Sequence, residues 1–252
     1  MSASTLYGAA EMPRAAYLPD IDQHDTFPKL LRYNAQKWGA RPAMREKDLG
    51  IWQSWTWAEV KAEIDRYAAG MSALGLGRGD RVAIIGDNRP RLYWTMCMAQ
   101  TLGAVPVPVY QDSVAAEIHF PLEHAEVRFA VVEDQEQVDK LLSIKDRLPK
   151  LETIVYDDER GVRDYTHGFL HSYESVVARG DEKLKAEPGF IDAEIDRGKG
   201  SDVSIIPYTS GTTGNPKGVV LSFDNVLKAA YAGASFEGLR ETDECLAYLP
   251  MA

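Results

Sequence analysis

Residues 209–218 read Thr-Ser-Gly-Thr-Thr-Gly-Asn-Pro-Lys-Gly, and they follow an apolar run that ends at Tyr208. The stretch holds four hydroxyl side chains, three glycines and one lysine. Glycine lets a backbone approach a ligand closely and turn its N–H groups towards it. Hydroxyls donate further hydrogen bonds, and Lys217 adds a positive charge on a flexible stem. The combination predicts a loop that binds a polyphosphate.

This stretch differs from the common nucleotide P-loop, which ends in Gly-Lys-Ser/Thr at the start of a helix. Here Lys217 stands between Pro216 and Gly218, and residues 219–221 are the strand-favouring Val-Val-Leu. We therefore expect a strand, a phosphate-binding loop and a second strand. The alternative is a plain polar hairpin, because Asn-Pro-Lys-Gly is also typical of turns. The full spacing, with Tyr208 in front, favours phosphate binding.

A resemblance to a known family starts at these residues. Residues 208–219 resemble the phosphate-loop signature of the adenylate-forming enzymes, which include acyl-CoA synthetases, luciferases and the adenylation domains of peptide synthetases. Residues 247–252, Ala-Tyr-Leu-Pro-Met-Ala, are similar to a segment of the long-chain acyl-CoA synthetases in which a histidine follows. Weaker similarity reaches back to Phe27. The chain departs from the pattern at Phe223-Asp224, where a histidine is common.

The resemblance implies a reaction and its ligands. Enzymes of this family join a carboxylate to the AMP part of ATP and release pyrophosphate, and a thiol then displaces AMP. For the complete enzyme it implies ATP, Mg²⁺ and coenzyme A, with a fatty acid as the carboxylate. Thr209 is also implied as a magnesium ligand, since Mg²⁺ keeps mostly water and phosphate oxygens. No residue of this chain is assigned a catalytic role. The residues implied to hold the β- and γ-phosphates are Thr209, Ser210, Gly211, Thr212, Thr213, Gly214 and Lys217.

Strand-like and helix-like segments alternate along most of the chain, which predicts an α/β fold with a mostly parallel sheet and helices on both faces. The resemblance makes this the N-terminal part of the large domain of an adenylate-forming enzyme. We expect residues 1–25 to be a poorly ordered leader and residues 26–252 to be a truncated AMP-binding domain, with the C-terminal domain absent. The expected strands are 81–86, 105–110, 128–132, 153–156, 202–208 and 244–249, besides a hairpin over 44–55. The expected helices are 26–39, 56–74, 91–102, 114–125, 135–147, 173–178, 181–187 and 222–234.

Composition argues against several classes of protein. The net charge of −10 argues against nucleic-acid binding, which needs clustered lysine and arginine. The first 20 residues lack the apolar block of a secretory signal. Cys97 and Cys245 both stand in apolar surroundings, and we expect both to be reduced core residues. These features favour a cytoplasmic protein, and peripheral contact with the inner face of a membrane stays open.

Other functions also stay open at this level. The family's later magnesium-binding glutamate, ribose-binding aspartate and C-terminal lysine have no counterparts here, so we expect the 252-residue chain alone to be inactive as a ligase. One alternative is a non-catalytic protein that binds a nucleotide or a partner. A second is a split enzyme completed by a separate C-terminal chain, with an exposed apolar edge near residues 248–252. An acyl-AMP ligase, or a domain that adenylates aryl or amino acids, is a third.

Overall fold

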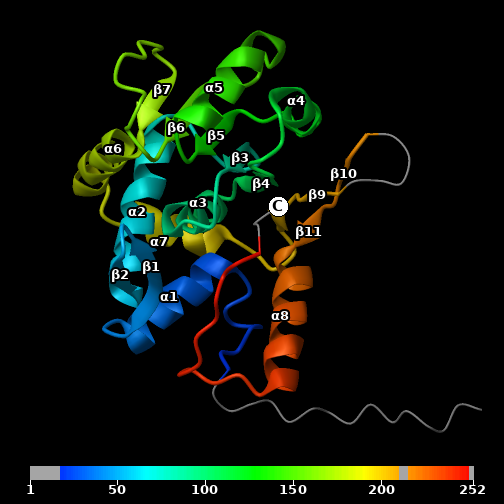
Figure 1. Cartoon of the computed structure of the whole chain (residues 1–252). Coiled ribbons are helices and arrows are strands. Elements are labelled where there is room, and N and C mark those ends of the chain that lie inside the picture. Colours follow the sequence, from blue (N-terminus) through cyan, green and yellow to red (C-terminus); the bar gives the residue numbers. More distant parts are fainter. Residues whose placement is uncertain (1–17, 210–214, 250–252) are drawn as a thin grey trace, which may run out of the picture.

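The computed structural model describes residues 18–209 and 215–249, and it is built around one parallel sheet (Figure 1). Five strands pair in the order β4-β3-β5-β6-β7, and every neighbouring pair is parallel. The α/β prediction is therefore confirmed. The predicted leader falls mostly outside the described residues. The strands are β3 (Arg81–Ile85), β4 (Val105–Val109), β5 (Phe129–Val132), β6 (Thr153–Tyr156) and β7 (Leu170–Ser172).

Helices cover both faces of this sheet, because successive strand residues point to opposite sides. On one face Val82 and Ile84 pack with α2, α3, α6 and α7, and on the other Ala83 and Ile85 pack with α4 and α5. Figure 1 shows the two helix layers on either side of the strands. The helices are α1 (Phe27–Trp38), α2 (Trp57–Ala73), α3 (Pro90–Thr101), α4 (Ala115–His124), α5 (Gln135–Ile144), α6 (Tyr173–Ala186), α7 (Phe190–Arg197) and α8 (Phe223–Glu237), with a 3-10 turn η1 (Lys145–Arg147) after α5.

Local signals set several helix starts where the sequence predicts them. The Thr56 hydroxyl accepts a hydrogen bond from the Glu59 N–H, and the Glu59 carboxylate accepts one from the Thr56 N–H. This reciprocal pair satisfies two backbone groups that the first turn of α2 would leave open. Thr26 caps α1 in the same way by accepting from the Lys29 N–H. Both features depend on residues three apart, so tertiary structure is not needed to find them.

The segment between residues 157 and 200 is more ordered than the sequence indicates. The two short helices expected at 173–178 and 181–187 form one helix, α6, while α7 and β7 were not predicted. Gly180 lies in the middle of α6, where it packs against α2. Ile191 and Ile195 of α7 are buried in the core beside α2 and α3. Burial against other helices thus stabilises helices that the polar sequence does not predict.

Two predictions about apolar residues are wrong. Residues 244–249 form no strand; instead the Asn88 amide donates hydrogen bonds to the carbonyls of Ala247 and Leu249. Cys245 in this segment is exposed, whereas Cys97 is only partly exposed and burial raises the pKa of its thiol to about 12. The segment lacks a neighbouring strand within the described residues, so its apolar composition alone does not make it a strand.

The predicted hairpin before α2 is confirmed. Strands β1 (Pro42–Asp48) and β2 (Ile51–Thr56) pair in antiparallel register. Trp55 packs edge-on against Trp94, with 5.4 Å between ring centroids, but Trp52 is largely exposed. Only one of these two rings therefore joins the core.

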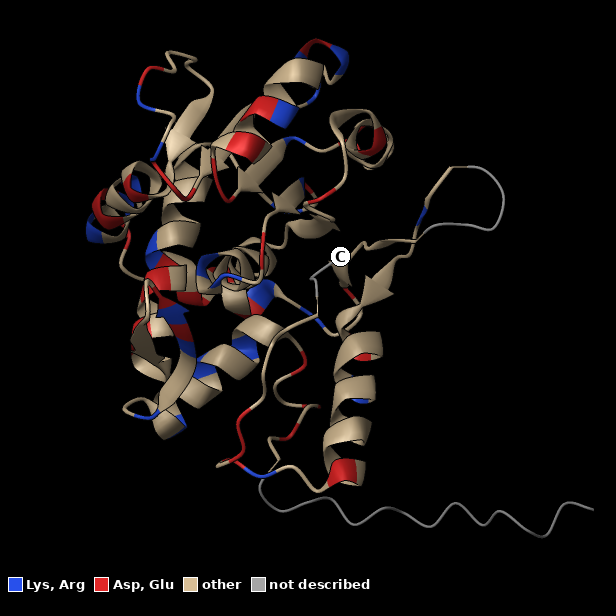
Figure 2. Ribbon diagram, viewed as in Figure 1, with Lys and Arg blue, Asp and Glu red and all other residues tan. Residues whose placement is uncertain are grey.

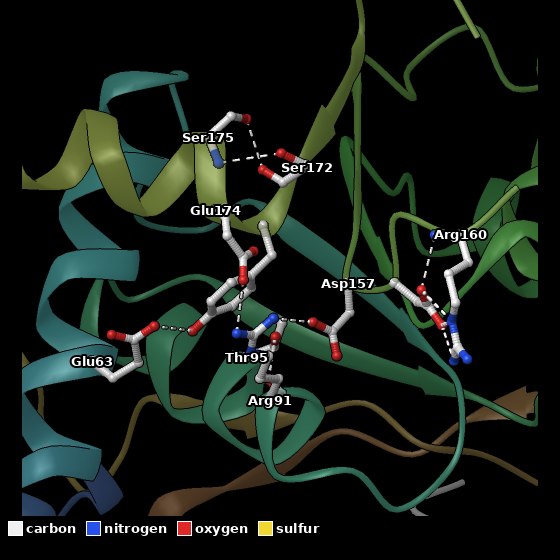
Figure 3. A network of polar contacts seen from close by, with 10 residues as sticks. Glu63, Arg91, Thr95, Asp157, Arg160, Ser172, Glu174 and Ser175 are labelled. Carbon is white, nitrogen blue, oxygen red and sulfur yellow. Dashed lines mark hydrogen bonds and ion pairs between the residues drawn. The ribbon is translucent and has the colours of Figure 1, made fainter. Parts of the chain in front are cut away.

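Polar contacts tie the carboxyl end of β6 to the helices around it (Figure 3). Arg91 at the start of α3 lies 2.6 Å from the Asp157 carboxylate and 2.8 Å from the Glu174 carboxylate. The Thr95 hydroxyl donates to the Arg91 carbonyl one turn earlier. Arg91 thus holds the end of β6 and the first turn of α6 together.

Within the described residues, no helix is both long and apolar enough to cross a bilayer.

Candidate phosphate-binding site

The predicted loop lies at the end of a narrow antiparallel hairpin. Strand β8 (Val203–Ile205) pairs with β11 (Leu221–Ser222), and beyond them β9 (Tyr208–Thr209) pairs with β10 (Lys217–Gly218). Paired strands therefore stand on both sides of the predicted loop, as expected, but Val219 and Val220, which were expected in the second strand, lie between β10 and β11. Figure 1 shows this hairpin projecting from the side of the molecule at β4. The loop residues Ser210, Gly211, Thr212, Thr213 and Gly214 lie outside the described residues.

Two contacts join the start of the hairpin to the main sheet and to helix α3. The backbone N–H of Ile206 donates to the Pro106 carbonyl on β4, at 3.0 Å. The buried Gln100 side chain on α3 donates to the carbonyl and the hydroxyl of Ser204, at 3.0 and 3.1 Å. Because both partners of this second contact are buried, it holds β8 in a fixed position relative to α3. The apolar strand that leads into the loop is thus fastened to the core.

Thr209 and Lys217, two of the predicted phosphate-binding residues, are brought together. They are direct cross-strand partners at the end of the hairpin, and both are exposed. Directly opposite residues in an antiparallel pair carry their side chains on the same face, with Cβ atoms about 5 Å apart. Within the described residues no acidic side chain forms an ion pair with Lys217. One hydroxyl and one ammonium group therefore face the same side at the mouth of the loop.

The neighbouring pair, Tyr208 and Gly218, faces the opposite side. The Tyr208 hydroxyl lies 2.7 Å from Nδ1 of His124, at the end of α4. The two rings meet edge-on, with 5.9 Å between their centroids. No pattern in the sequence indicates this contact, because His124 is far from Tyr208 along the chain and its own neighbours indicate a solvated helix end.

After the hairpin, β11 leads directly into α8. Ser222 caps this helix by accepting from the Asn225 N–H. The departure from the family pattern at Phe223-Asp224 falls here. Phe223 is buried against the Phe27 ring, at 6.0 Å, and the N–H of Asp224 donates to the Gly200 carbonyl. The departure therefore serves local packing and leaves Thr209 and Lys217 untouched.

Comparison with known proteins shows the family of this chain. The pattern of the AMP-binding enzymes matches residues 31–252, which is most of the chain. The chain belongs to the AMP-binding enzyme family. It is 29% identical over 242 residues to a long-chain-fatty-acid–CoA ligase of Xenopus laevis, and 30% identical over 232 residues to one of Rattus norvegicus. These alignments cover 94% and 90% of the chain.

The chain spans about a third of the length of these relatives, 31% and 34% respectively. Among solved structures it is similar to a putative long-chain-fatty-acid CoA ligase of Rhodopseudomonas palustris, with a TM-score of 0.72 and 22% identity. That alignment covers 90% of this chain and 51% of the other. At this identity the similarity shows the shared fold.

In this member of the AMP-binding enzyme family the charged residues are unevenly distributed. In Figure 2, viewed as in Figure 1, the ribbon of α5 and α6 carries several blue and red segments, which mark basic and acidic residues, whereas the hairpin and α8 carry fewer. The part of α8 that is C-terminal to Asn225 also has an exposed, largely apolar face. Its exposed members are Ala229, Ala230, Ala232, Gly233 and Phe236.

Proposed function

We propose that this chain forms the N-terminal, phosphate-binding part of an AMP-forming ligase that converts a fatty acid to its coenzyme A thioester. The observation that carries the proposal is the placement of Thr209 and Lys217 on one face at the mouth of the signature loop. The names of the relatives support a long-chain fatty acid as the carboxylate. Residues 26–252 would then be part of an AMP-binding domain.

In the proposed reaction a carboxylate oxygen attacks the α-phosphorus of ATP, and the bond to the bridging oxygen of pyrophosphate breaks. The thiol of coenzyme A then attacks the acyl carbon and AMP leaves. Lys217 would neutralise charge on the β- and γ-phosphates, which become the leaving pyrophosphate. The hydroxyl of Thr209 would donate to the same phosphates or bind their metal ion. Residues 210–214 would add backbone and hydroxyl donors.

Among the described residues, the site would supply magnesium with only a small part of its ligand shell. Thr209 offers one hydroxyl oxygen, which suits an ion that keeps water and phosphate oxygens as its other ligands. When bound, magnesium would neutralise phosphate charge beside Lys217. The fit is to a metal–nucleotide complex that the loop holds through the phosphates.

Replacement of Lys217 by alanine tests the proposal. We expect Lys217→Ala to weaken binding of ATP to the purified chain at least about 10-fold, because a charge-assisted contact contributes about 1.5–3 kcal/mol. The matched control is Lys228→Ala on α8, since Lys228 is also exposed and forms an ion pair with Asp224, one turn away. The measurement is isothermal titration with MgATP. Equal affinity of the wild type and Lys217→Ala would contradict the phosphate-binding role.

We further propose that another polypeptide, equivalent to the rest of the relatives' length, packs against α8. The exposed apolar face of α8 supports this, as do Leu246, Tyr248 and Leu249, each at least 65% exposed. Exposed apolar surface of this kind marks contact sites. The competing function is a non-catalytic nucleotide-binding protein, which would bind ATP but gain no ligase activity from such a polypeptide.

A further inference from the structure

The two strands at the end of the hairpin are short for a structure that we propose to hold a ligand. Strands β9 and β10 have two residues each, and isolated short hairpins are marginally stable in water. Thr209 and Lys217 therefore need support from outside the hairpin to keep a fixed orientation. The only residues of β9 and β10 that face the body of the protein are Tyr208 and Gly218.

Gly218 makes room for the Tyr208 ring. A Cβ atom at position 218 would lie 3.2 Å from Cζ and 3.3 Å from the hydroxyl oxygen of Tyr208, and 3.1 Å from the Ile206 side chain. These distances are shorter than ordinary carbon contacts. The absent side chain lets the Tyr208 ring lie across β10, so that the hydroxyl reaches past the strand.

His124 receives that hydroxyl. Its Nδ1 is 2.7 Å from the Tyr208 oxygen, and the Phe120 ring stacks on the His124 ring with 5.3 Å between centroids and 21° between planes. Partial burial raises the pKa of Tyr208, which keeps the phenol protonated. The pair can form one hydrogen bond in either tautomer of the neutral histidine. Phe120 keeps the imidazole at the angle that this bond requires.

We propose that His124 is a positioning residue for the phosphate loop, acting through Tyr208. Because side chains alternate along a strand, fixing Tyr208 against α4 turns Thr209 to the opposite face. The cross-strand pairing of Gly218 with Tyr208 does the same for Lys217. The Tyr208–His124 contact thus sets the direction in which both phosphate-binding side chains point. This inference rests on the proposed function, but its structural part can be measured without a ligand.

The first test uses hydrogen–deuterium exchange of the full chain without nucleotide. Two backbone N–H groups report on the hairpin: Val219, which donates to Pro207 at 2.8 Å, and Ile206, which donates to Pro106. In His124→Phe and Tyr208→Phe we expect exchange of Val219 to quicken about 3- to 10-fold, the range of one neutral hydrogen bond. Exchange of Ile206, which has its own bond to β4, should change less. Unchanged exchange of Val219 in both variants would overturn the inference.

The second test is the affinity for MgATP of the same variants, of the double variant and of two further variants. Each single variant should bind about 3- to 10-fold more weakly, and the double variant should be no worse than either single one. His124→Asn, whose amide can stand near the position of Nδ1, should restore most of the affinity. His119→Phe is the control on the same helix, because His119 contacts the Arg147 carbonyl instead. Additive losses in the double variant, or no rescue by asparagine, would contradict a shared contact.

The two tests separate failure of the inference from failure of the proposed function. If the wild-type chain binds no MgATP, the phosphate-binding function fails, while the exchange rates of Val219 still decide whether the contact holds the hairpin. If the wild type binds MgATP and the variants match it in both measurements, only the positioning role of His124 fails. Melting temperatures within about 2 °C of the wild type would show that the variants remain folded.

Discussion

At the residue scale, the contact between Arg66 and Asp181 links pH to stability. Arg66 on α2 donates two hydrogen bonds of 2.6 Å to the Asp181 carboxylate on α6. The arginine lowers the pKa of Asp181 below its ordinary value of 3.8. A lowered pKa in the folded state means that the pair stabilises the fold above that ordinary value. The contribution is lost as the pH falls through the pKa of the folded state.

Asp181→Asn should therefore lower the free energy of unfolding at pH 7 by about 0.5–1 kcal/mol, a value limited by the partial exposure of both side chains. The deficit should shrink as the pH falls below about 4 and vanish below the lowered pKa of Asp181, because Asp181 of the wild type is then protonated as well. Urea unfolding across this pH range measures it. Glu182→Gln, at an exposed position on the same helix, is the control and should have little effect. A deficit that stays constant from pH 7 to pH 3 would argue against the charge pair.

At the element scale, α2 and α6 cross closely because each has a glycine at the crossing. A Cβ on Gly180 would lie 1.8 Å from the Arg66 carbonyl oxygen, and one on Gly70 would lie 2.0 Å from the Val176 carbonyl oxygen. Backbone atoms cannot move aside as a flexible side chain can. The glycines therefore set the distance between the helices, and with it the place of the Arg66–Asp181 pair.

Gly180→Ala should destabilise the protein by about 3 kcal/mol or more, since the helices have to separate to admit the methyl group. The matched control is Gly233→Ala on α8, where nothing lies within 4 Å of the added Cβ. That variant should gain up to about 1 kcal/mol, because alanine favours a helix more than glycine does. Thermal unfolding of both variants measures the difference. Equal effects at the two positions would show that helix propensity, and not the crossing, decides.

At the scale of the whole molecule, α8 presents an exposed and largely apolar face. Its buried residues, Phe223 and Leu227, lie in the first two turns, and Phe236 near its end is 80% exposed. The chain also spans only about a third of the length of its relatives. The exposed apolar residues support the proposed packing of further protein against this face.

The 252-residue chain by itself should therefore form no measurable acyl-CoA from palmitate, MgATP and coenzyme A. Adding a polypeptide equivalent to the remainder of a relative should produce the thioester and a complex of defined mass. Phe236→Asp should weaken that complex at least about 10-fold, because a charge would be buried against an apolar surface. Lys228→Ala serves as the control on the same helix. Acyl-CoA formation by the chain alone would show that no further polypeptide is required.

Features that depend on neighbouring residues could be read from the sequence. The α/β class follows from the alternation of apolar segments, and the Thr56–Glu59 capping box involves a spacing of three residues. The hairpin around residues 209–217 follows from its own strands and turn residues. Each of these rests on backbone geometry and short-range hydrogen bonds, which residues close in the sequence determine.

Features that join distant segments were decided by the tertiary structure alone. Helices α6 and α7 form in a polar stretch of sequence because Val176 and Ile195 are buried in the core. Cys245 is exposed because its segment meets no strand among the described residues. His124 reaches Tyr208 because α4 ends beside β9. The sequence by itself therefore determined most strands of the sheet, the helices between them and the motif that we propose to bind phosphate, through local propensity and periodicity. Only the packing of elements far apart along the chain decided the remaining elements, which surfaces are covered and which side chains contact the hairpin.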